Sequence, residues 1–304
     1  MVSFRSLAFL VVVFSILGNG CADPPPTEDS AAGDSIATAA PGTDVYVAPL
    51  DATVDSLRVG SPTPVTTRSG YDNQPAFLPE ENGLVWTSIR NGQADIYRSG
   101  KTGEPSRLTN TPESEFSPTP RPKGQMTVVR VEADGRQRLW RYRLDGTPVE
   151  PVLPDADSVG YHAWLDSTRV ALFVLGSPPT LHVADVAAGT DTVVATRIGR
   201  SLRTVPGTAD VSFVQVGPDS TTAIHVLDGE TLNTRRLTAT LGNGAGDFHA
   251  WGPSGYLFMA AGNRLQAWHP ESDRWRTAAK LDTMNVSRLA VSSDGDRLAF
   301  VVDE

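Results

Sequence analysis

An internal repeat constrains the fold of this chain more than any other feature of its sequence. Short apolar runs such as Leu84–Trp86, Val170–Val174 and Leu298–Val302 recur between residues 44 and 304. Consecutive repeats are 43, 44, 41, 46 and 40 residues apart at the position just before each run, which holds Phe77, Pro120, Trp164, Val205, Trp251 and Val291. A period in the low forties limits the chain to a stack or a ring of similar units.

The segments between the apolar runs carry turn signals and no long helical period. Asn91-Gly92, Asp134-Gly135 and Asp294-Gly295 are pairs that supply the positive φ angles of tight β-hairpins. Each unit has room for four short strands, which is the pattern of a propeller blade. The sequence therefore predicts an all-β fold, a six-bladed β-propeller of four-stranded antiparallel blades, over residues 44–304.

The last unit holds only two strands, between Arg288 and Val302. The first folded segment supplies the missing part, because Asp44–Val47 matches Asp95–Arg98 of the next unit and Val65–Thr67 matches Leu108-Thr109. An open ring would expose unpaired strand edges, which folded proteins avoid. We therefore expect the N-terminal strands to complete the last blade and close the ring.

Two units resemble a known family. Gln74–Pro79, Leu84–Arg90, Gly92–Tyr97 and Arg107–Thr109 together look like the TolB-like, WD-related propeller blade, and Val291–Phe300 is a second good match. The resemblance covers residues 44–304 and implies a TolB-like six-bladed propeller. TolB also carries a separate N-terminal α/β domain, for which this chain has only a short polar segment. The resemblance therefore implies nothing about a role in the Tol system.

The N-terminus predicts export. The apolar run Leu7–Leu17 is too short to span a bilayer but fits the core of a signal peptide, so residues 1–20 are predicted as a signal peptide. Cys21, the only cysteine, follows directly and resembles the acylated residue of bacterial lipoproteins. An ordinary secretory signal is the alternative. Residues 21–43, rich in Pro, Ala, Ser and Asp, are predicted to be a lipid-anchored disordered tether in the bacterial cell envelope, either periplasm or outer membrane.

Charge and motifs exclude several functions. Asp and Glu total 35 against 26 Lys and Arg, a net charge of −9, which argues against nucleic acid as a partner. The sequence contains no Gly-x-Ser-x-Gly elbow, no His-Glu-x-x-His and no Walker loop. Accordingly, we predict no catalytic residue and no cofactor.

The repeat nevertheless brings polar residues to one place. Tyr161-His162-Ala163-Trp164 and Phe248-His249-Ala250-Trp251 occupy the same position in two units, just before the innermost strand. The candidate ligand-binding residues at the mouth of the channel are Gln74, Glu115, His162, Arg203, His249 and Arg288. TolB-like oligogalacturonate lyases hold a divalent metal on channel histidines, so His162 and His249 are the alternative metal ligands. Two histidines are fewer than the three or four ligands such a site needs, and bonding to backbone or water is the simpler interpretation.

These observations favour a non-catalytic, envelope-anchored propeller that binds a protein or peptide partner. A carbohydrate lyase or hydrolase using the channel site is one alternative, and a sensor of a small polar ligand is another.

Overall fold

The computed structural model describes residues 41–304, except 54–55, 80–82, 101–103, 243, 245–246 and 283. The predicted signal peptide, Cys21 and most of the predicted tether lie outside the described residues. None of the described residues forms a helix long and apolar enough to cross a membrane.

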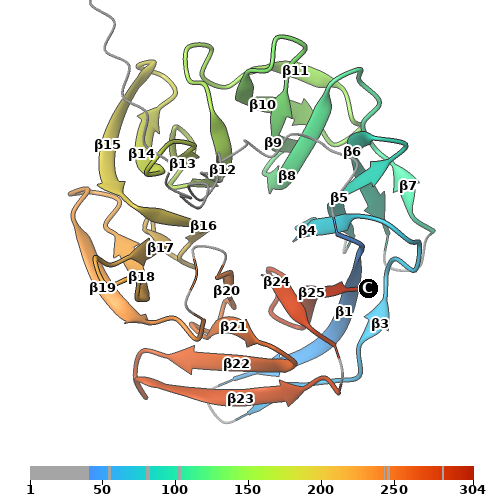
Figure 1. The fold of residues 1–304 in the computed structure, drawn as a ribbon, viewed down its shortest axis with the longest axis vertical. Coiled ribbons are helices and arrows are strands. Elements are labelled where there is room, and N and C mark those ends of the chain that lie inside the picture. The colour runs from blue at the N-terminus through green and yellow to red at the C-terminus, as the bar shows by residue number, and fades with distance from the viewer. Residues whose placement is uncertain are drawn as a thin grey trace, which may run out of the picture. The chain divides into compact units, whose positions relative to one another are not determined.

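The described residues form six antiparallel sheets arranged radially around a centre, as predicted (Figure 1). Four sheets follow one another in the chain from the first complete blade. Their strands are given from the innermost outward. The first blade comprises β4 (Asp72–Phe77), β5 (Leu84–Arg90), β6 (Gln93–Ser99) and β7 (Ser106–Arg107), and the second comprises β8 (Ser114–Arg121), β9 (Gln125–Val131), β10 (Gln137–Arg143) and β11 (Pro148–Pro151). The third comprises β12 (Val159–Trp164), β13 (Arg169–Val174), β14 (Thr180–Asp185) and β15 (Thr190–Thr196), and the fourth comprises β16 (Ile198–Thr204), β17 (Val211–Val216), β18 (Thr222–Leu227) and β19 (Thr234–Ala239).

The other two sheets lead to the end of the chain. The fifth blade comprises β20 (His249–Trp251), β21 (Leu257–Ala261), β22 (Arg264–His269) and β23 (Arg274–Lys280). The sixth comprises β24 (Val286–Val291), β25 (Arg297–Asp303), β1 (Thr43–Ala52), β2 (Leu57–Val59) and β3 (Thr63–Pro64). Below, the blades are numbered one to six in this order, so that β4 opens blade one and β24 opens blade six.

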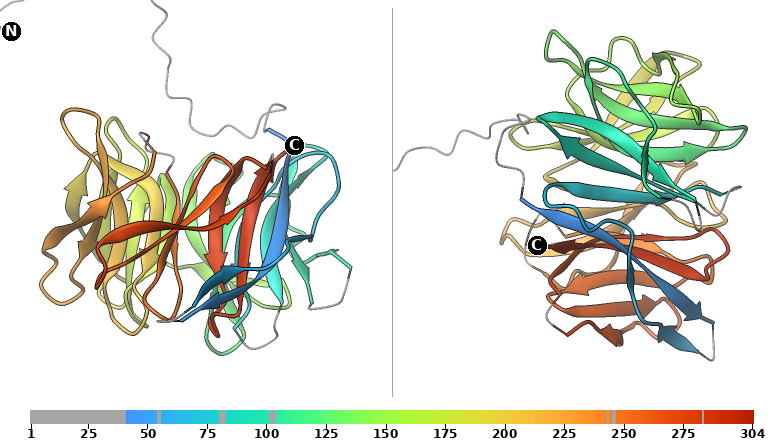
Figure 2. Two further views of the ribbon diagram at one scale, coloured as in Figure 1. Left: turned by 90° about the horizontal axis from the view of Figure 1, so that it is seen from below. Right: turned by 90° about the vertical axis from the view of Figure 1, so that its right-hand side faces the viewer.

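The predicted closure of the ring is confirmed. β1 pairs antiparallel with β25 from Thr43↔Asp303 to Pro49↔Arg297, and Figure 2 shows the N-terminal strand beside the C-terminal ones. The match of Thr66 with Thr109 also holds in detail. Thr66 Oγ1 accepts the Val45 amide at 2.9 Å, and Thr109 Oγ1 accepts the Ile96 amide at 2.9 Å.

The hydrophobic core is divided among the blade interfaces. The described residues contain six buried apolar clusters, each built from two neighbouring blades. Trp86, Trp164 and Trp268 are at most 6% exposed and lie in three of these clusters. Aromatic side chains thus fill the wedges between sheets, because they bury the largest area per residue.

One repeat position differs from the sequence alignment. In blade three, Trp164 pairs with Val170, the first core residue of the second strand. In blade four, the residue that pairs with the corresponding Val211 is Thr204, whereas the sequence alignment put Val205 there. The place of His162 is therefore taken by Leu202, and Arg203 stands one residue further along β16. The loop after the inner strand causes the offset, because six residues separate Thr204 from Val211 and only five separate Trp164 from Val170.

Candidate functional site

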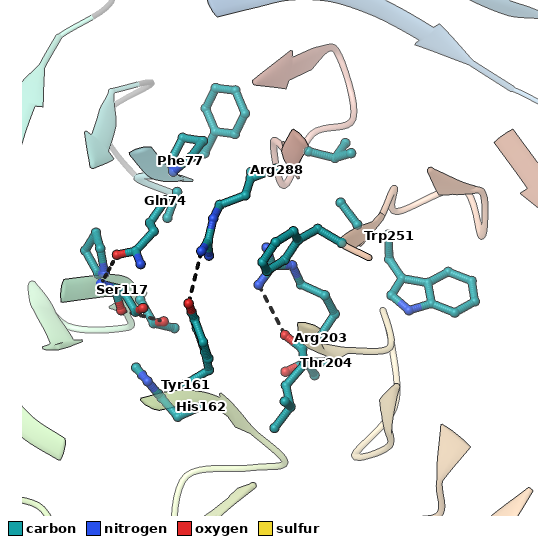
Figure 3. A pocket seen from close by; sticks show the side chains of 18 of the residues that line it. Gln74, Phe77, Ser117, Tyr161, His162, Arg203, Thr204, Trp251 and Arg288 are labelled. Carbon is teal, nitrogen blue, oxygen red and sulfur yellow. Dashed lines mark hydrogen bonds between the residues drawn. The ribbon is translucent and has the colours of Figure 1, made fainter. Parts of the chain in front are cut away.

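A cavity of about 270 Å³ lies among the six inner strands (Figure 3). All six blades contribute to its lining, which includes Gln74, Ser117, Tyr161, His162, Arg200, Arg203, Phe248, Trp251 and Arg288. Four of the six predicted residues, Gln74, His162, Arg203 and Arg288, thus meet in one cavity. We call it the channel cavity.

Arg203 enters the channel because its neighbours leave room. The equivalent positions of the other five blades hold small residues, namely Ala76, Thr119, Ala163, Ala250 and Ala290. The Arg203 guanidinium donates to the carbonyl of Leu202 and, across to blade six, to the carbonyl of Leu289, both at 3.2 Å. Burial and the nearby Arg288 lower the pKa of Arg203 to about 10, so it stays charged at neutral pH.

Arg288 lies between two aromatic rings. Its guanidinium donates to the Tyr161 hydroxyl at 3.0 Å, from the blade opposite its own, and lies 4.0 Å from the ring centre of Phe248. Aromatic faces attract a guanidinium and hold its plane. Neither Tyr161 nor Phe248 was a predicted site residue. The signal was present, because each directly precedes the histidine in the two matching His-Ala-Trp segments.

His162 is buried and neutral. Its Nε2 lies 2.8 Å from Thr127 Oγ1, and burial together with Arg121 and Arg203 lowers the His162 pKa to about 3. Thr127 Oγ1 also accepts the Trp164 Nε1–H at 3.1 Å. The Thr127 hydroxyl proton is then available for His162 Nε2, which favours the tautomer with a proton on Nδ1.

Gln74 presents its amide nitrogen. Its Oε1 accepts the Ser117 backbone amide at 2.7 Å and the Thr87 hydroxyl at 2.8 Å, so the side-chain NH₂ is the end left to face the cavity (Figure 3). Gln74 itself has φ 60°.

Glu115 and His249 do not line the channel cavity. Glu115 is fully buried between blades one and two, where it accepts hydrogen bonds from Thr109, Thr111 and Tyr142. His249 is also fully buried; its Nδ1 lies 3.0 Å from Ser201 Oγ and its Nε2 2.7 Å from Ser212 Oγ. The repeat could not place Glu115, because a bulge between Phe116 and Thr119 separates it from the paired end of β8. His249 holds the same position as His162, and Ser201 of blade four engages its Nδ1 instead.

The alternative metal site at His162 and His249 is also not assembled, because Ser201 and Ser212 engage both ring nitrogens of His249. No group of three or more His, Cys, Asp or Glu side chains within the described ranges could hold a metal ion.

The channel cavity is cationic. Three arginines line it, and its described lining includes no Asp or Glu, although the whole chain carries −9. A second cavity of about 420 Å³ shares His162 and Arg203 with it and reaches Arg121, whose guanidinium lies 3.8 Å from the ring centre of Trp164; its lining also includes Asp166. In the channel cavity itself, cations and hydrogen-bond donors converge without a carboxylate in the described lining, which suits an anionic group.

Comparison with known proteins identifies the fold. No family model and no curated protein matches the sequence. A structure assigned as TolB from Agrobacterium tumefaciens superposes with a TM-score of 0.68 at 14% identity, covering 88% of this chain and 99% of that one. TolB from Acinetobacter baumannii gives a TM-score of 0.56 at 15% identity, covering 86% of this chain and 64% of that one. An oligogalacturonate lyase in complex with manganese gives 0.55 at 14% identity, covering 80% and 79%. The chain therefore has the TolB-like propeller fold.

Proposed function

We propose that this protein is a non-catalytic, envelope-anchored propeller that binds a protein or peptide partner by taking an acidic group of that partner into the channel cavity. The observation that carries the proposal is the charge of the cavity. Arg203 and Arg288 come from different blades and converge where the described lining holds no carboxylate. An arginine pair in a partly desolvated cavity recognises a carboxylate far more strongly than exposed arginines do.

The size of the cavity supports a peptide group over a long sugar chain. Pockets for drug-sized ligands usually measure about 300–1,000 Å³, whereas the channel cavity has about 270 Å³. That volume fits one acidic side chain or one chain end, and the adjoining second cavity adds the guanidinium of Arg121, which lies over the Trp164 ring. A small acidic metabolite would also fit, which keeps the sensor as an alternative.

Export and anchoring are part of the same proposal. They rest on the short apolar run Leu7–Leu17 and on Cys21 directly after the signal-like segment. The fold of the TolB structures is compatible with them. Replacing Cys21 by Ser should move the mature protein from the membrane fraction to the soluble fraction. A variant that stays with the membranes as the parent does would contradict the lipid anchor.

Binding can be followed by intrinsic fluorescence, since Trp251 lines the channel cavity and Trp164 lines the second one. An array of acidic peptides should include binders whose affinity falls as salt is raised. Arg203→Gln and Arg288→Gln should each weaken binding about tenfold or more. Arg235→Gln, on the exposed outer strand β19, is the matched control and should bind like the parent. Equal binding by all three variants would refute the channel cavity as the binding site.

A lyase acting on an acidic sugar is the second candidate, because the same cationic cavity suits a uronate. It predicts that the purified protein releases unsaturated products from polygalacturonate, detected by their ultraviolet absorbance. Peptide binding without any such product would favour the binding protein.

A further inference from the structure

Two blade interfaces contain copies of one hydrogen-bonded arrangement. In each copy, a strand carrying His-Ala-Trp packs against a hydroxyl on the second strand of the preceding blade. In blade three, His162 Nε2 lies 2.8 Å from Thr127 Oγ1 and Trp164 Nε1–H donates to the same oxygen at 3.1 Å. The copy in blade five uses His249, Trp251 and Ser212, at 2.7 and 2.8 Å. The copy in blade five can therefore be compared directly with the copy in blade three.

The copy in blade five is closed. Ser201, on the inner strand of blade four, brings its Oγ to 3.0 Å from His249 Nδ1 and also accepts the His249 backbone amide at 3.1 Å. Both ring nitrogens of His249 therefore have partners, and the side chain is fully buried. This copy is complete without a ligand.

The copy in blade three is open. Ser117 stands in β8 at the place that Ser201 holds in β16, three residues before the paired positions Pro120 and Thr204. Yet Ser117 Oγ and His162 Nδ1 are both buried, and neither has a hydrogen-bond partner among the described residues. His162 is only 5% exposed, and both residues line the channel cavity (Figure 3). Buried polar atoms without a partner are rare, because a desolvated donor or acceptor without a hydrogen bond destabilises the folded state.

The backbone of Ser117 explains why this copy stays open. Ser117 has φ 53°, a left-handed conformation that a serine in a strand rarely adopts, whereas Ser201 is not in that region. The Ser117 amide donates to Gln74 Oε1 at 2.7 Å, and Gln74 also has positive φ. Strained residues of this kind persist where the surrounding structure holds them, and they gather at ligand sites. A contact from blade one thus keeps Ser117 turned away from the closed arrangement.

The open copy offers two donors to the cavity. The Thr127 hydroxyl proton is directed at His162 Nε2, which leaves the His162 proton on Nδ1. The Ser117 hydroxyl adds a second O–H. Arg203 and Arg288 supply positive charge in the same cavity. Two neutral donors near two guanidinium groups match the four lone-pair positions of a carboxylate better than those of a neutral or cationic group.

We propose that Ser117 and His162 form a seat for one oxygen of a carboxylate, with Ser117 Oγ–H and His162 Nδ1–H as the donors. This proposal rests on the proposed function, and it adds which side chains hold the acidic group. The carboxylate can be the C-terminus of a peptide or the side chain of an Asp or Glu residue, and the test separates these two sources.

The probes are two short peptides, acetyl-Ala-Ala-Ala with a free C-terminus and acetyl-Ala-Asp-Ala with an amidated one. Binding is measured by calorimetry and by ¹⁵N spectra of the histidine rings. Ser117→Ala should weaken the bound probe about tenfold or more, as expected for one hydrogen bond to a charged group, and should not lower the melting temperature. The matched Ser201→Ala should lower the melting temperature, because it leaves His249 Nδ1 unpaired, and should keep the affinity of the parent. On titration with the bound probe, the Nδ1 signal of His162 should shift and that of His249 should not.

Several results would overturn the seat. Parent-like affinity in Ser117→Ala, or an equal loss in Ser201→Ala, would do so. Suppose that Arg203→Gln abolishes binding of a probe, Ser117→Ala binds it with the affinity of the parent, and the His162 Nδ1 signal does not shift. The proposed function then stands and the seat is wrong. If neither peptide binds the parent, both proposals fail for carboxylates. Binding of only one peptide assigns the carboxylate to the chain end or to the side chain.

Discussion

Removing the N-terminal strands tests whether ring closure holds the protein together. A chain starting at Tyr71 lacks β1, β2 and β3, whereas a chain starting at Thr43 keeps them. Without β1, the edge of β25 loses its pairing from Arg297 to Asp303, and the sixth blade keeps only two strands. We expect the shorter chain to be insoluble or far less stable.

The expected loss can be estimated from what β1 buries. Val45 is 0% exposed, Ala48 0% and Leu50 6%, and Tyr46 stacks on Phe300 with ring centres 5.9 Å apart. Burying a Val or Leu side chain contributes about 1.5–3 kcal/mol, and an Ala methyl about 0.8 kcal/mol. These three side chains together give about 4–7 kcal/mol, which is comparable with the whole stability of many domains, about 5–15 kcal/mol.

A single substitution gives a graded version of the same test. Val45 packs against Trp86 and Val301, at the junction of the two chain ends with blade one. Val45→Ala should lower the free energy of unfolding by about 2 kcal/mol, which corresponds to about 4–8 °C in melting temperature for a domain of this size. Val193→Ala, at a side chain 53% exposed, should change it by less than about 0.5 kcal/mol. The assay is thermal unfolding followed by circular dichroism. Equal melting temperatures for the chains starting at Thr43 and Tyr71 would refute closure by the N-terminal strands.

Three further predictions concern the buried polar groups. Burial lowers the pKa of His249 to about 3, so below pH 6.5 the unfolded chain takes up a proton that the folded chain does not, and stability falls by about 1.4 kcal/mol per pH unit for this histidine. The free energy of unfolding, measured by guanidinium titration at pH 6.5 and pH 5, should therefore fall less in His249→Gln than in the parent. An equal fall in both proteins would contradict a neutral His249. Ser212→Ala leaves His249 Nε2 and Trp251 Nε1 without their partner and should lower the free energy of unfolding by about 2–4 kcal/mol. Ser254→Ala, in an exposed turn, should lower it by less than about 0.5 kcal/mol. Similar melting temperatures for the two variants would be evidence against the hydrogen bonds of Ser212 to blade five. Tyr142→Phe removes a 3.0 Å hydrogen bond to the buried Glu115 and should lower the free energy of chemical unfolding by about 1–2 kcal/mol. A variant as stable as the parent would show that this hydrogen bond does not contribute to stability.

The candidate site was only partly predictable. The repeat indicated that distant segments would meet around a channel, and Gln74, His162, Arg203 and Arg288 do line one cavity. The same repeat placed Glu115 among them, but its carboxylate lies between blades one and two, bonded to Tyr142. A period in the sequence gives the blade to which a residue belongs. It does not give the face of the strand, because one bulge residue reverses every side chain that follows it.

The sequence by itself determined the architecture of this protein. The spacing of the apolar runs set the number of blades, and the match of Val65-Thr66 with Leu108-Thr109 identified the strands that close the ring. These features are local and repeated, so each copy supports the others. Only the tertiary structure decided the chemistry of the channel. His162 and His249 have the same neighbours in the sequence, yet Ser201 closes one histidine while the strained backbone of Ser117 leaves the other open. That difference depends on contacts between blades, through Gln74 of blade one, and such contacts arise only when the ring has formed.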